Sequence, residues 1–409
     1  MEPVMSARAR WLSVLAAGLI MGAALGIRNV QGLYLLPVTM DRGWTREAFS
    51  FAVAMQNLVW GLAQPFTGMV ADRLGSGKVI FVGALGYALG LVLMAHSATP
   101  ADFTLGDGAV IGIALSGTAF GAVYGALSRI FAAQHRSWAL GVAGAIGGLG
   151  QFVMVPMAQQ MLGRMQWTSS LLILAVVMLA VSPFGAWLRD DSSKTAGARR
   201  HSQSMGDAIR EAFAHRGFWL LNLGFVACGF QLAFIAGHLP AYLIDKGMGP
   251  SDCGIALALI ALANVIGTYM CGHLGGILRG KYVLSVLYFF RSGIMALFVM
   301  LPLSSVGLYL FSFAMGLVWL GTVPLTTGVV SQVFGVQYIT TLFGIVFFGH
   351  QIGAFFGVWL GGYVFDVMKS YDLIWIGSIA LGLFAGIVHL PINDREIGSV
   401  RPAAVAEAA

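Results

Sequence analysis

Charged residues are scarce in this sequence. Of its 409 residues, 10% are Asp, Glu, Lys or Arg, whereas 58% are hydrophobic. Soluble domains usually carry about 25% charged and about 45–50% apolar residues. A water-soluble fold could not hide so much apolar surface. This composition therefore excludes a soluble protein and predicts one that resides in a lipid bilayer.

Cysteine is also scarce. The three cysteines are Cys228, Cys253 and Cys271. An odd number of cysteines without CxxC spacing indicates neither a disulfide framework nor a metal site. We therefore expect no metal and no cofactor.

What the sequence has instead is a series of long apolar runs between short charged segments. A membrane-spanning helix needs about 20 mostly apolar residues. The runs predict an all-α membrane protein with twelve transmembrane helices, at residues 11–37, 48–71, 79–96, 108–131, 138–162, 169–188, 218–243, 253–278, 282–302, 306–331, 340–365 and 373–390.

Lys and Arg are distributed unevenly over the connections between these runs. With the N-terminus placed in the cytoplasm, only Arg42, Arg46, Arg164, Lys246 and Lys369 fall outside. This bias predicts a multi-pass inner-membrane protein with both termini in the cytoplasm. The net charge of +6 then reflects contact with anionic lipid, and no nucleic-acid partner is expected. The first run is too long for a signal peptide and lacks a cleavage site, so it is predicted to be the first span.

A polar stretch, residues 189–216, separates the first six runs from the last six. It predicts an N-terminal bundle at residues 1–188, a linker at 189–216 and a C-terminal bundle at 217–409. Shifting the sequence by 203 residues aligns three pairs between the halves, Gly26 with Gly229, Pro37 with Pro240 and Gly141 with Gly344. This recurrence indicates an internal duplication.

Glycine recurs every four residues in three of the runs. Such stripes allow neighbouring helices to approach closely. The predicted packing stripes are Gly18, Gly22 and Gly26, then Gly117, Gly121 and Gly125, and finally Gly349, Gly353, Gly357 and Gly361.

The connection after the second run reads GMVADRLGSGK. This segment resembles the signature loop of the major facilitator superfamily. The resemblance implies two pseudo-symmetric six-helix bundles, joined by loops that take part in conformational change. We predict this gating role for Gly68, Asp72, Arg73, Gly75 and Lys78. The equivalent loop after the eighth run, GHLGGILRGK, keeps the glycines and basic residues but lacks the Asp.

Three further stretches resemble the monocarboxylate porters and the bacterial oxalate/formate-type carriers. They are GIRNVQGLYL, RSWALGVAGAIGGLGQ and GFQLAFIAGHLPAYL. The resemblance implies transport of small organic anions. The sequence departs from this resemblance at two places. In the eighth run, Asn264 and Thr268 stand where the monocarboxylate porters have an acidic residue and an arginine. The eleventh run lacks the lysine of the oxalate carriers.

Ionisable residues within the spans are few. Acidic side chains fall only in loops, termini and helix ends, so no buried carboxylate is expected. Arg28 and Arg291 do lie within spans, and a charge at the bilayer centre costs at least about 2.5 kcal/mol. Arg28 points away from the stripe of Gly18, Gly22 and Gly26. In the resemblance, its sequence position is close to that of the basic first-helix residue of the monocarboxylate porters, so we predict that it binds a carboxylate. A structural role is the alternative for Arg28 and the favoured role for Arg291.

Two histidines are the predicted proton-coupling groups, because histidine changes charge near pH 6.5. They are His238 and His350, and each could instead be a hydrogen-bonded structural residue. Both are also assigned to the substrate site with Arg28. The other predicted substrate-binding residues are Asn57, Tyr124, Gln231 and Asn264.

These features predict a monomeric secondary active transporter of small organic anions, working by alternating access as a proton-coupled monocarboxylate symporter. The alternative is an exporter or antiporter of a hydrophobic drug or metabolite. The fifth run favours uptake, since it contains Gly147, Gly148 and Gly150 without the glycine–proline pair of exporters. A membrane sensor or an integral-membrane enzyme is less favoured, because no nucleophile–base set, metal cluster or signalling domain is found.

Overall fold

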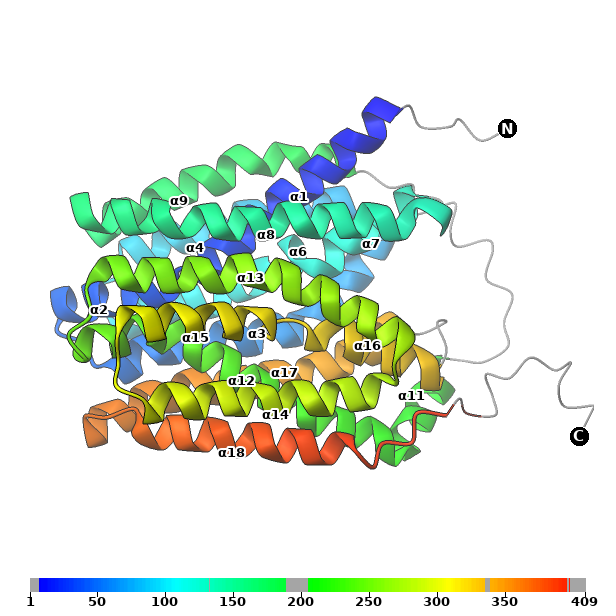
Figure 1. Ribbon diagram of the computed structural model, residues 1–409. Coiled ribbons are helices and arrows are strands. Elements are labelled where there is room, and N and C mark those ends of the chain that lie inside the picture. The colour runs from blue at the N-terminus through cyan, green and yellow to red at the C-terminus, as the bar shows by residue number, and fades with distance from the viewer. Residues whose placement is uncertain (1–6, 132, 189–204, 335–338, 396, 398–409) are drawn as a thin grey trace, which may run out of the picture.

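The chain folds into a bundle of long helices (Figure 1). The computed structural model describes residues 7–131, 133–188, 205–334, 339–395 and 397, and these residues contain no β-strand. Before residue 189 the elements are α1 (Ala7–Asn29), α2 (Gln31–Arg42), α3 (Arg46–Leu74), α4 (Ser76–Ala95), α5 (Pro100–Thr104), the π-helix η1 (Leu105–Ile111), α6 (Gly112–Thr118), α7 (Phe120–Ile130), α8 (Ala133–Arg164), α9 (Trp167–Val181) and the 3-10 helix η2 (Ser182–Leu188). After residue 204 they are α11 (Met205–Ala214), α12 (Arg216–Asp245), α13 (Pro250–Ile277), α14 (Gly280–Met300), α15 (Ser305–Leu317), α16 (Thr322–Phe334), α17 (Ile339–Met368) and α18 (Asp372–His389).

Within the described residues, 11 helical segments are long and apolar enough to cross a membrane. The remaining predicted span is α3, which is 29 residues long. Its polar residues Gln56, Asn57 and Gln64 lower its hydropathy, and it packs inside the bundle along α17. The predicted all-α membrane architecture is confirmed.

Three of the predicted spans are interrupted. The first consists of α1 and α2, which meet at Val30. The fourth begins at Pro100, earlier than predicted, passes through η1 and breaks at Ala119, whose backbone is extended. The tenth breaks between α15 and α16. Such breaks are tolerated at membrane depth only where protein or a water-filled cavity surrounds the freed backbone groups.

Two of the three predicted glycine stripes pack as expected. A Cβ added at Gly22 of α1 would lie 3.1 Å from the Cα of Gly150 on α8. The four glycines of α17 all face α12, where added Cβ atoms would meet Asn222, Val226, Phe230 and His238 in turn. The remaining prediction, a single stripe of Gly117, Gly121 and Gly125, is wrong. The break at Ala119 turns Gly117 toward α4 and Gly121 toward Gln64 of α3.

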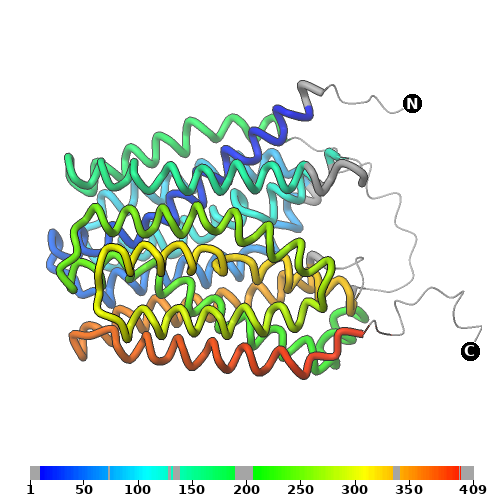
Figure 2. Tube along the Cα trace, in the orientation of Figure 1, coloured from blue at the N-terminus to red at the C-terminus, as the bar shows by residue number. Residues whose placement is uncertain are grey.

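The two ends of the bundle carry different segments. The beginning of α1 and the end of α18 lie at one end (Figure 2), termed the terminal end. The connections α2–α3, α12–α13 and α17–α18 lie at the other, termed the opposite end (Figure 1). Within the predicted linker, the described part is the helix α11, whereas residues 189–204 lie outside the described residues.

Candidate functional site

Arg28 lies in the last turn of α1, directly before the break at Val30. Its Nη2 donates a hydrogen bond to Oδ1 of Asn57 on α3, and its guanidinium lies 5.3 Å from the ring centroid of Trp60. Asn57 is fully buried and is held by its own Nδ2, which donates to the Val53 carbonyl at 2.8 Å. The guanidinium is thus anchored to α3 and does not face lipid. No described residue accepts a hydrogen bond from its buried Nε.

The second half of the chain contacts the two partners of this arginine, Asn57 and Trp60, through α17. Nε2 of Gln351 donates to the Asn57 carbonyl at 3.2 Å, and the ring of Phe347 packs edge-on against Trp60 with centroids 5.4 Å apart. Within α17, Nδ1 of His350 lies 3.1 Å from Oε1 of Gln351. We term these contacting residues the junction cluster: Arg28, Asn57, Trp60, Phe347, His350 and Gln351. Of the predicted site residues, the cluster brings together Arg28, Asn57 and His350.

His350 is half-buried among aromatic rings. It lies parallel to Phe347 with centroids 5.7 Å apart, and 4.7 Å from the ring of Phe225 on α12. Tyr124 of α7 is also half-buried, with its ring 5.7 Å from Phe120 and its hydroxyl close to Gly144 of α8. Its hydroxyl is not joined to the junction cluster in this structure.

The expectation that no carboxylate is buried in a span is wrong. Asp107 lies in the π-helix η1 with 0% of its surface exposed. Its Oδ1 accepts hydrogen bonds from Nε2 of Gln31 on α2 and Nε2 of Gln56 on α3, both at 2.7 Å. Arg28 interacts with it electrostatically. The arginine therefore has a buried acid nearby, contrary to the prediction.

A helix-start signal in the sequence could have placed Asp107 inside the span. Thr99 and Asp102 form a reciprocal capping box, and Pro100 occupies the first turn. This pattern starts a helix at Pro100. Asp107 is then about two turns inside, whereas counting the span from Gly108 put it at the edge.

His238 lies apart from Arg28, near the opposite end of α12. It is fully buried, and its Nε2 lies 2.8 Å from the Val358 carbonyl and 3.3 Å from Oγ of Ser50. Its Nδ1 lies 3.2 Å from the hydroxyl of Tyr371. A neutral ring that donates from Nε2 and accepts at Nδ1 satisfies these contacts, so the geometry matches the structural role weighed for this histidine.

Gln231 and Asn264 lie in the packing of the second half rather than beside Arg28. Gln231 is fully buried, donates to the Ser378 carbonyl at 2.8 Å and accepts from Arg291 at 3.3 Å. Oδ1 of Asn264 accepts from the backbone N–H of Leu320 at 3.0 Å, inside the α15–α16 break. The structure does not bring either residue to the junction cluster.

Arg291 also has a structural role. It is fully buried, and its Nη2 donates to the carbonyls of Val318 and, at 2.8 Å, of Trp319. Both carbonyls belong to the α15–α16 break. The guanidinium therefore satisfies backbone groups that the broken helix leaves without partners.

The opposite end is closed by contacts between the halves. Arg46 at the start of α3 binds Asp245 through both terminal nitrogens, at 2.6 and 2.7 Å, and lies 3.7 Å above the ring of Phe365. Asp366 of α17 accepts from the backbone N–H of Glu47 at 2.6 Å and so caps α3. Hydrogen bonds between the halves continue along α3 from this ion pair to the contact of Asn57 with Gln351, roughly 17 Å away. Among the described residues, none is found further along α3.

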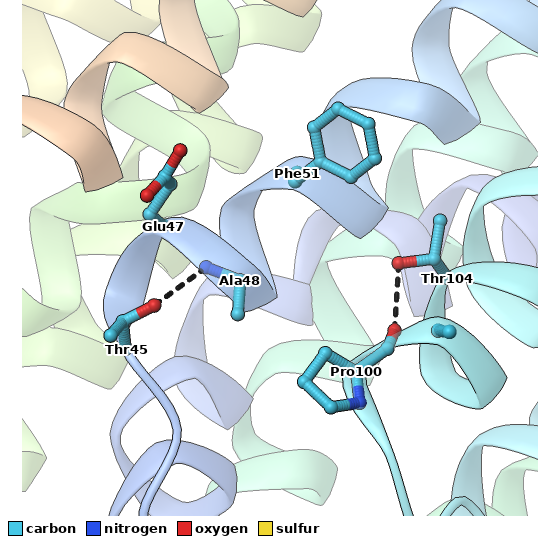
Figure 3. A pocket seen from close by; sticks show the side chains of 7 residues that line it. Thr45, Glu47, Ala48, Phe51, Pro100 and Thr104 are labelled. Atoms are coloured by element: carbon cyan, nitrogen blue, oxygen red, sulfur yellow. Dashed lines mark hydrogen bonds between the residues drawn. The ribbon is translucent and has the colours of Figure 1, made fainter.

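A hollow of about 450 Å³ opens at the same end, between the starts of α3 and α5. Figure 3 shows that its hydroxyls are already engaged, since Thr45 accepts from the Ala48 N–H and Thr104 donates to the Pro100 carbonyl. None of the predicted site residues lines it. We therefore do not place the functional site there.

The predicted gating loop, residues 68–78, is mostly helical: Gly68 lies in α3 and Lys78 in α4, and only Gly75 falls between the two helices, at the terminal end. Gly75 has a φ of +90°, a conformation that favours glycine, and its N–H caps α3 by bonding to the Ala71 carbonyl at 2.9 Å. Gly68 has open space around its Cα, and Lys78 is exposed. The side chains of Asp72 and Arg73 lie outside what the structure describes.

The fold and the junction cluster define a polytopic membrane transporter with a polar centre between two helical bundles. A family model described as Major Facilitator Superfamily matches residues 9–358, and the chain belongs to that family. It is a transporter and not an enzyme.

Named relatives agree with this membership. The chain is 26% identical to the uncharacterized MFS-type transporter YcxA of Bacillus subtilis, covering 96% of this chain and 97% of that protein. It is 24% identical to monocarboxylate transporter 13 of Rattus norvegicus, with 93% and 89% covered, and 25% identical to monocarboxylate transporter 11 of Homo sapiens, with 96% and 84% covered. The fold is similar to that of a bacterial homolog of the human lysosomal transporter Spinster, titled as inward-facing and occupied. That match has a TM-score of 0.75 and 13% identity, and it covers 96% of this chain and 100% of that one.

Proposed function

We propose that the chain is a secondary active transporter of small organic anions, and specifically a proton-coupled monocarboxylate symporter. The observation that carries this proposal is the position of Arg28. Its guanidinium is fixed by Asn57 and Trp60 where the halves meet, and its buried Nε has no hydrogen-bond acceptor among the described residues. A substrate carboxylate would supply that acceptor.

The similarity to monocarboxylate transporters 11 and 13 supports the same substrate class. Tyr124 is proposed to donate to the substrate, because its hydroxyl is not used by the cluster. Of the two histidines, His350 is better placed to exchange a proton with the substrate site. It contacts Gln351 of the junction cluster, whereas the ring nitrogens of His238 contact Val358 and Tyr371.

We further propose that bundles 1–188 and 217–409 rock about the junction cluster as a monomer, with 189–216 as the linker. The terminal end would face the cytoplasm, which places the protein in the cytoplasmic membrane with both termini inside. The contacts between the halves at Arg46 and Asp245 then correspond to a state closed to the outside. Gly68, Asp72, Arg73, Gly75 and Lys78 would support the rearrangement on the inner side.

An exporter of hydrophobic compounds is the second candidate, because aromatic rings surround the same centre. Trp60, Phe347 and Phe225 lie within contact of Arg28 or His350. Such a surface would also accommodate an apolar substrate. In that case Arg28 would be dispensable for transport.

Flux into proteoliposomes separates these functions. With an inward proton gradient, wild-type protein should accumulate radiolabelled pyruvate, and Arg28→Gln should reduce the initial rate by about tenfold or more, since a hydrogen bond to a charged group contributes about 1.5–3 kcal/mol. The matched control is Arg42→Gln, which changes an exposed arginine of α2. Full pyruvate uptake by Arg28→Gln, or transport of rhodamine but no monocarboxylate, would overturn the proposal.

A further inference from the structure

The buried acid in the first half is surrounded by polar groups with unused hydrogen-bonding capacity. Asp107 uses Oδ1 for both glutamine contacts, and its buried Oδ2 has no partner among the described residues. The same is true of the Oε1 atoms of Gln31 and Gln56 and of Nε of Arg28. Four unsatisfied atoms in one small region are unusual in a packed interior.

Local sequence explains why Asp107 is enclosed. Gly106 and Gly108 flank it, and Cβ atoms added at these positions would lie 2.9 Å from the Gly90 carbonyl on α4 and 2.8 Å from Cβ of Met55 on α3. The lack of side chains at both positions lets η1 approach α3 and α4 closely. A π-helical turn inside a longer helix is frequently found at functional sites.

The charged and titratable neighbours of Asp107 are few. From α1, Arg28 interacts with it electrostatically, and from α4, Tyr87 does so while its hydroxyl donates to the Ala24 carbonyl at 3.0 Å. The elements α2 and α3 contribute the neutral amides of Gln31 and Gln56, and α6 carries no ionisable residue. In α5, Asp102 is exposed and caps its own helix.

The two glutamines can satisfy either form of the acid. In the structure, two side-chain N–H groups stabilise a carboxylate. If one amide rotates by half a turn, its Oε1 becomes an acceptor for the O–H of a carboxylic acid. Protonation therefore requires no movement of the backbone.

We propose that Asp107 is the proton-carrying group of this transporter and that it is loaded together with the anion bound at Arg28. This inference rests on the proposed transport of an anion together with a proton, and it assigns that proton to Asp107 instead of His350. In the empty site, the positive charge of Arg28 is balanced by the carboxylate of Asp107. In the loaded site, Arg28 is balanced by the substrate anion, and Asp107 gains one proton from water and becomes neutral.

Coupling follows from the charge of these states. The empty, deprotonated site and the loaded, protonated site both have a net charge of zero, whereas either mixed state carries an unbalanced charge in a buried region. Unbalanced charge is costly at membrane depth, so the two neutral states would be the ones that change conformation. Because linkage is reciprocal, the anion favours protonation of Asp107 as much as the proton favours the anion.

Infrared spectroscopy of the reconstituted full-length protein tests the proton site directly. On acidification, wild-type protein should show the C=O band of a buried carboxylic acid, and addition of pyruvate at constant pH should increase it. Asp107→Asn should lack this band, whereas the matched control Asp102→Asn should keep it. Arg28→Gln should keep the acid-induced band but lose its response to pyruvate.

Transport provides the second measurement. Asp107→Asn should lose the acceleration of pyruvate uptake by an inward proton gradient while retaining pyruvate–pyruvate exchange, and the matched control Asp102→Asn should keep both. If Asp107→Asn does not fold, Gln56→Leu serves instead. Removing one donor from the carboxylate should move the midpoint of the acid-induced band to higher pH by about one unit or more.

The outcomes separate this inference from the proposed function. A wild-type protein that shows no pyruvate flux and no infrared response to pyruvate overturns both. Proton-coupled pyruvate flux that survives Asp107→Asn overturns the assignment of Asp107 alone. A band that persists in Asp107→Asn does the same.

Discussion

Each half of the molecule breaks its fourth helix and fully buries a charged side chain, but the two halves use that charge differently. In the second half, the terminal nitrogens of Arg291 donate to two backbone carbonyls of the α15–α16 break, to Gln231 and to Cys228. In the first half, Asp107 lies before the break at Ala119 and keeps a free oxygen beside the half-buried Arg28. The difference indicates that the buried charge of the second half supports a break in the backbone, whereas that of the first half retains an atom available for chemistry.

The repeat position of Arg28 reinforces this contrast. At the aligned position of the second half stands Gln231, which connects Arg291 to the Ser378 carbonyl of α18. A neutral amide there completes a packed network, whereas the guanidinium in the first half reaches across to α3. The halves thus share their arrangement of helices but differ in their polar residues, and under the proposed function one is a binding half and the other a supporting half.

The largest expected effect comes from removing Arg291, which supports the α15–α16 break. Arg291→Met should lower the thermal stability of the purified protein strongly, because it leaves the carbonyls of Val318 and Trp319 buried without donors at about 1–3 kcal/mol each. Arg28→Met should change the melting temperature less, since Asn57 loses one donor and Asp107 can take up a proton in place of its charged neighbour, while pyruvate uptake is lost. Melting followed by a thiol-reactive dye measures both variants. Equal losses of stability would contradict the assignment of Arg291 and Arg28 to different roles.

Much of the fold could be predicted from the sequence, because apolar runs and glycine spacing directly reflect burial and helix packing. The stripe on α17 faces α12 at all four glycines, as regular spacing implies. The predicted stripe that begins at Gly117 is wrong because a break at Ala119 changes the helix face. The residue at the break is neither a proline nor a glycine, so the sequence gives no signal of it. Periodicity assumes a continuous helix, so it cannot register such a break.

The candidate site was only partly predictable. Arg28 and Asn57 were identified because polar residues inside apolar runs are costly and therefore informative. Asp107 was missed although Thr99, Pro100 and Asp102 marked the helix start. The contacts of Gln231 and Asn264 could not be foreseen, since a side chain's partners on α18 or in the α15–α16 break depend on tertiary packing.

A smaller effect should distinguish the two buried asparagines. Asn264→Ala removes the acceptor for the Leu320 N–H and should cost about 1 kcal/mol of stability with little change in the affinity for pyruvate. Asn57→Ala frees the guanidinium of Arg28 and should weaken pyruvate binding several-fold. Binding isotherms and melting curves of both variants are the measurement. If Asn264→Ala impairs binding more than Asn57→Ala, the division into a binding half and a supporting half is wrong.

The smallest expected effect concerns an acid that does contact a base. Beyond α18, Asp394 is bonded by Arg279 at 3.0 Å through Nε, and this pairing holds the pKa of the carboxyl below its usual range. A lowered folded-state pKa contributes stability that is present above the unfolded value, about 3.9, and is lost as the pH falls through the folded value. The difference in melting temperature between wild type and Asp394→Asn should therefore be constant near neutral pH and shrink below about pH 4. The contrary result would be a melting-temperature difference that changes between pH 6 and 8, roughly two or more units above the range of an ordinary Asp. It would show that this carboxyl titrates as a buried acid without a basic partner. That result would remove the contrast with Asp107.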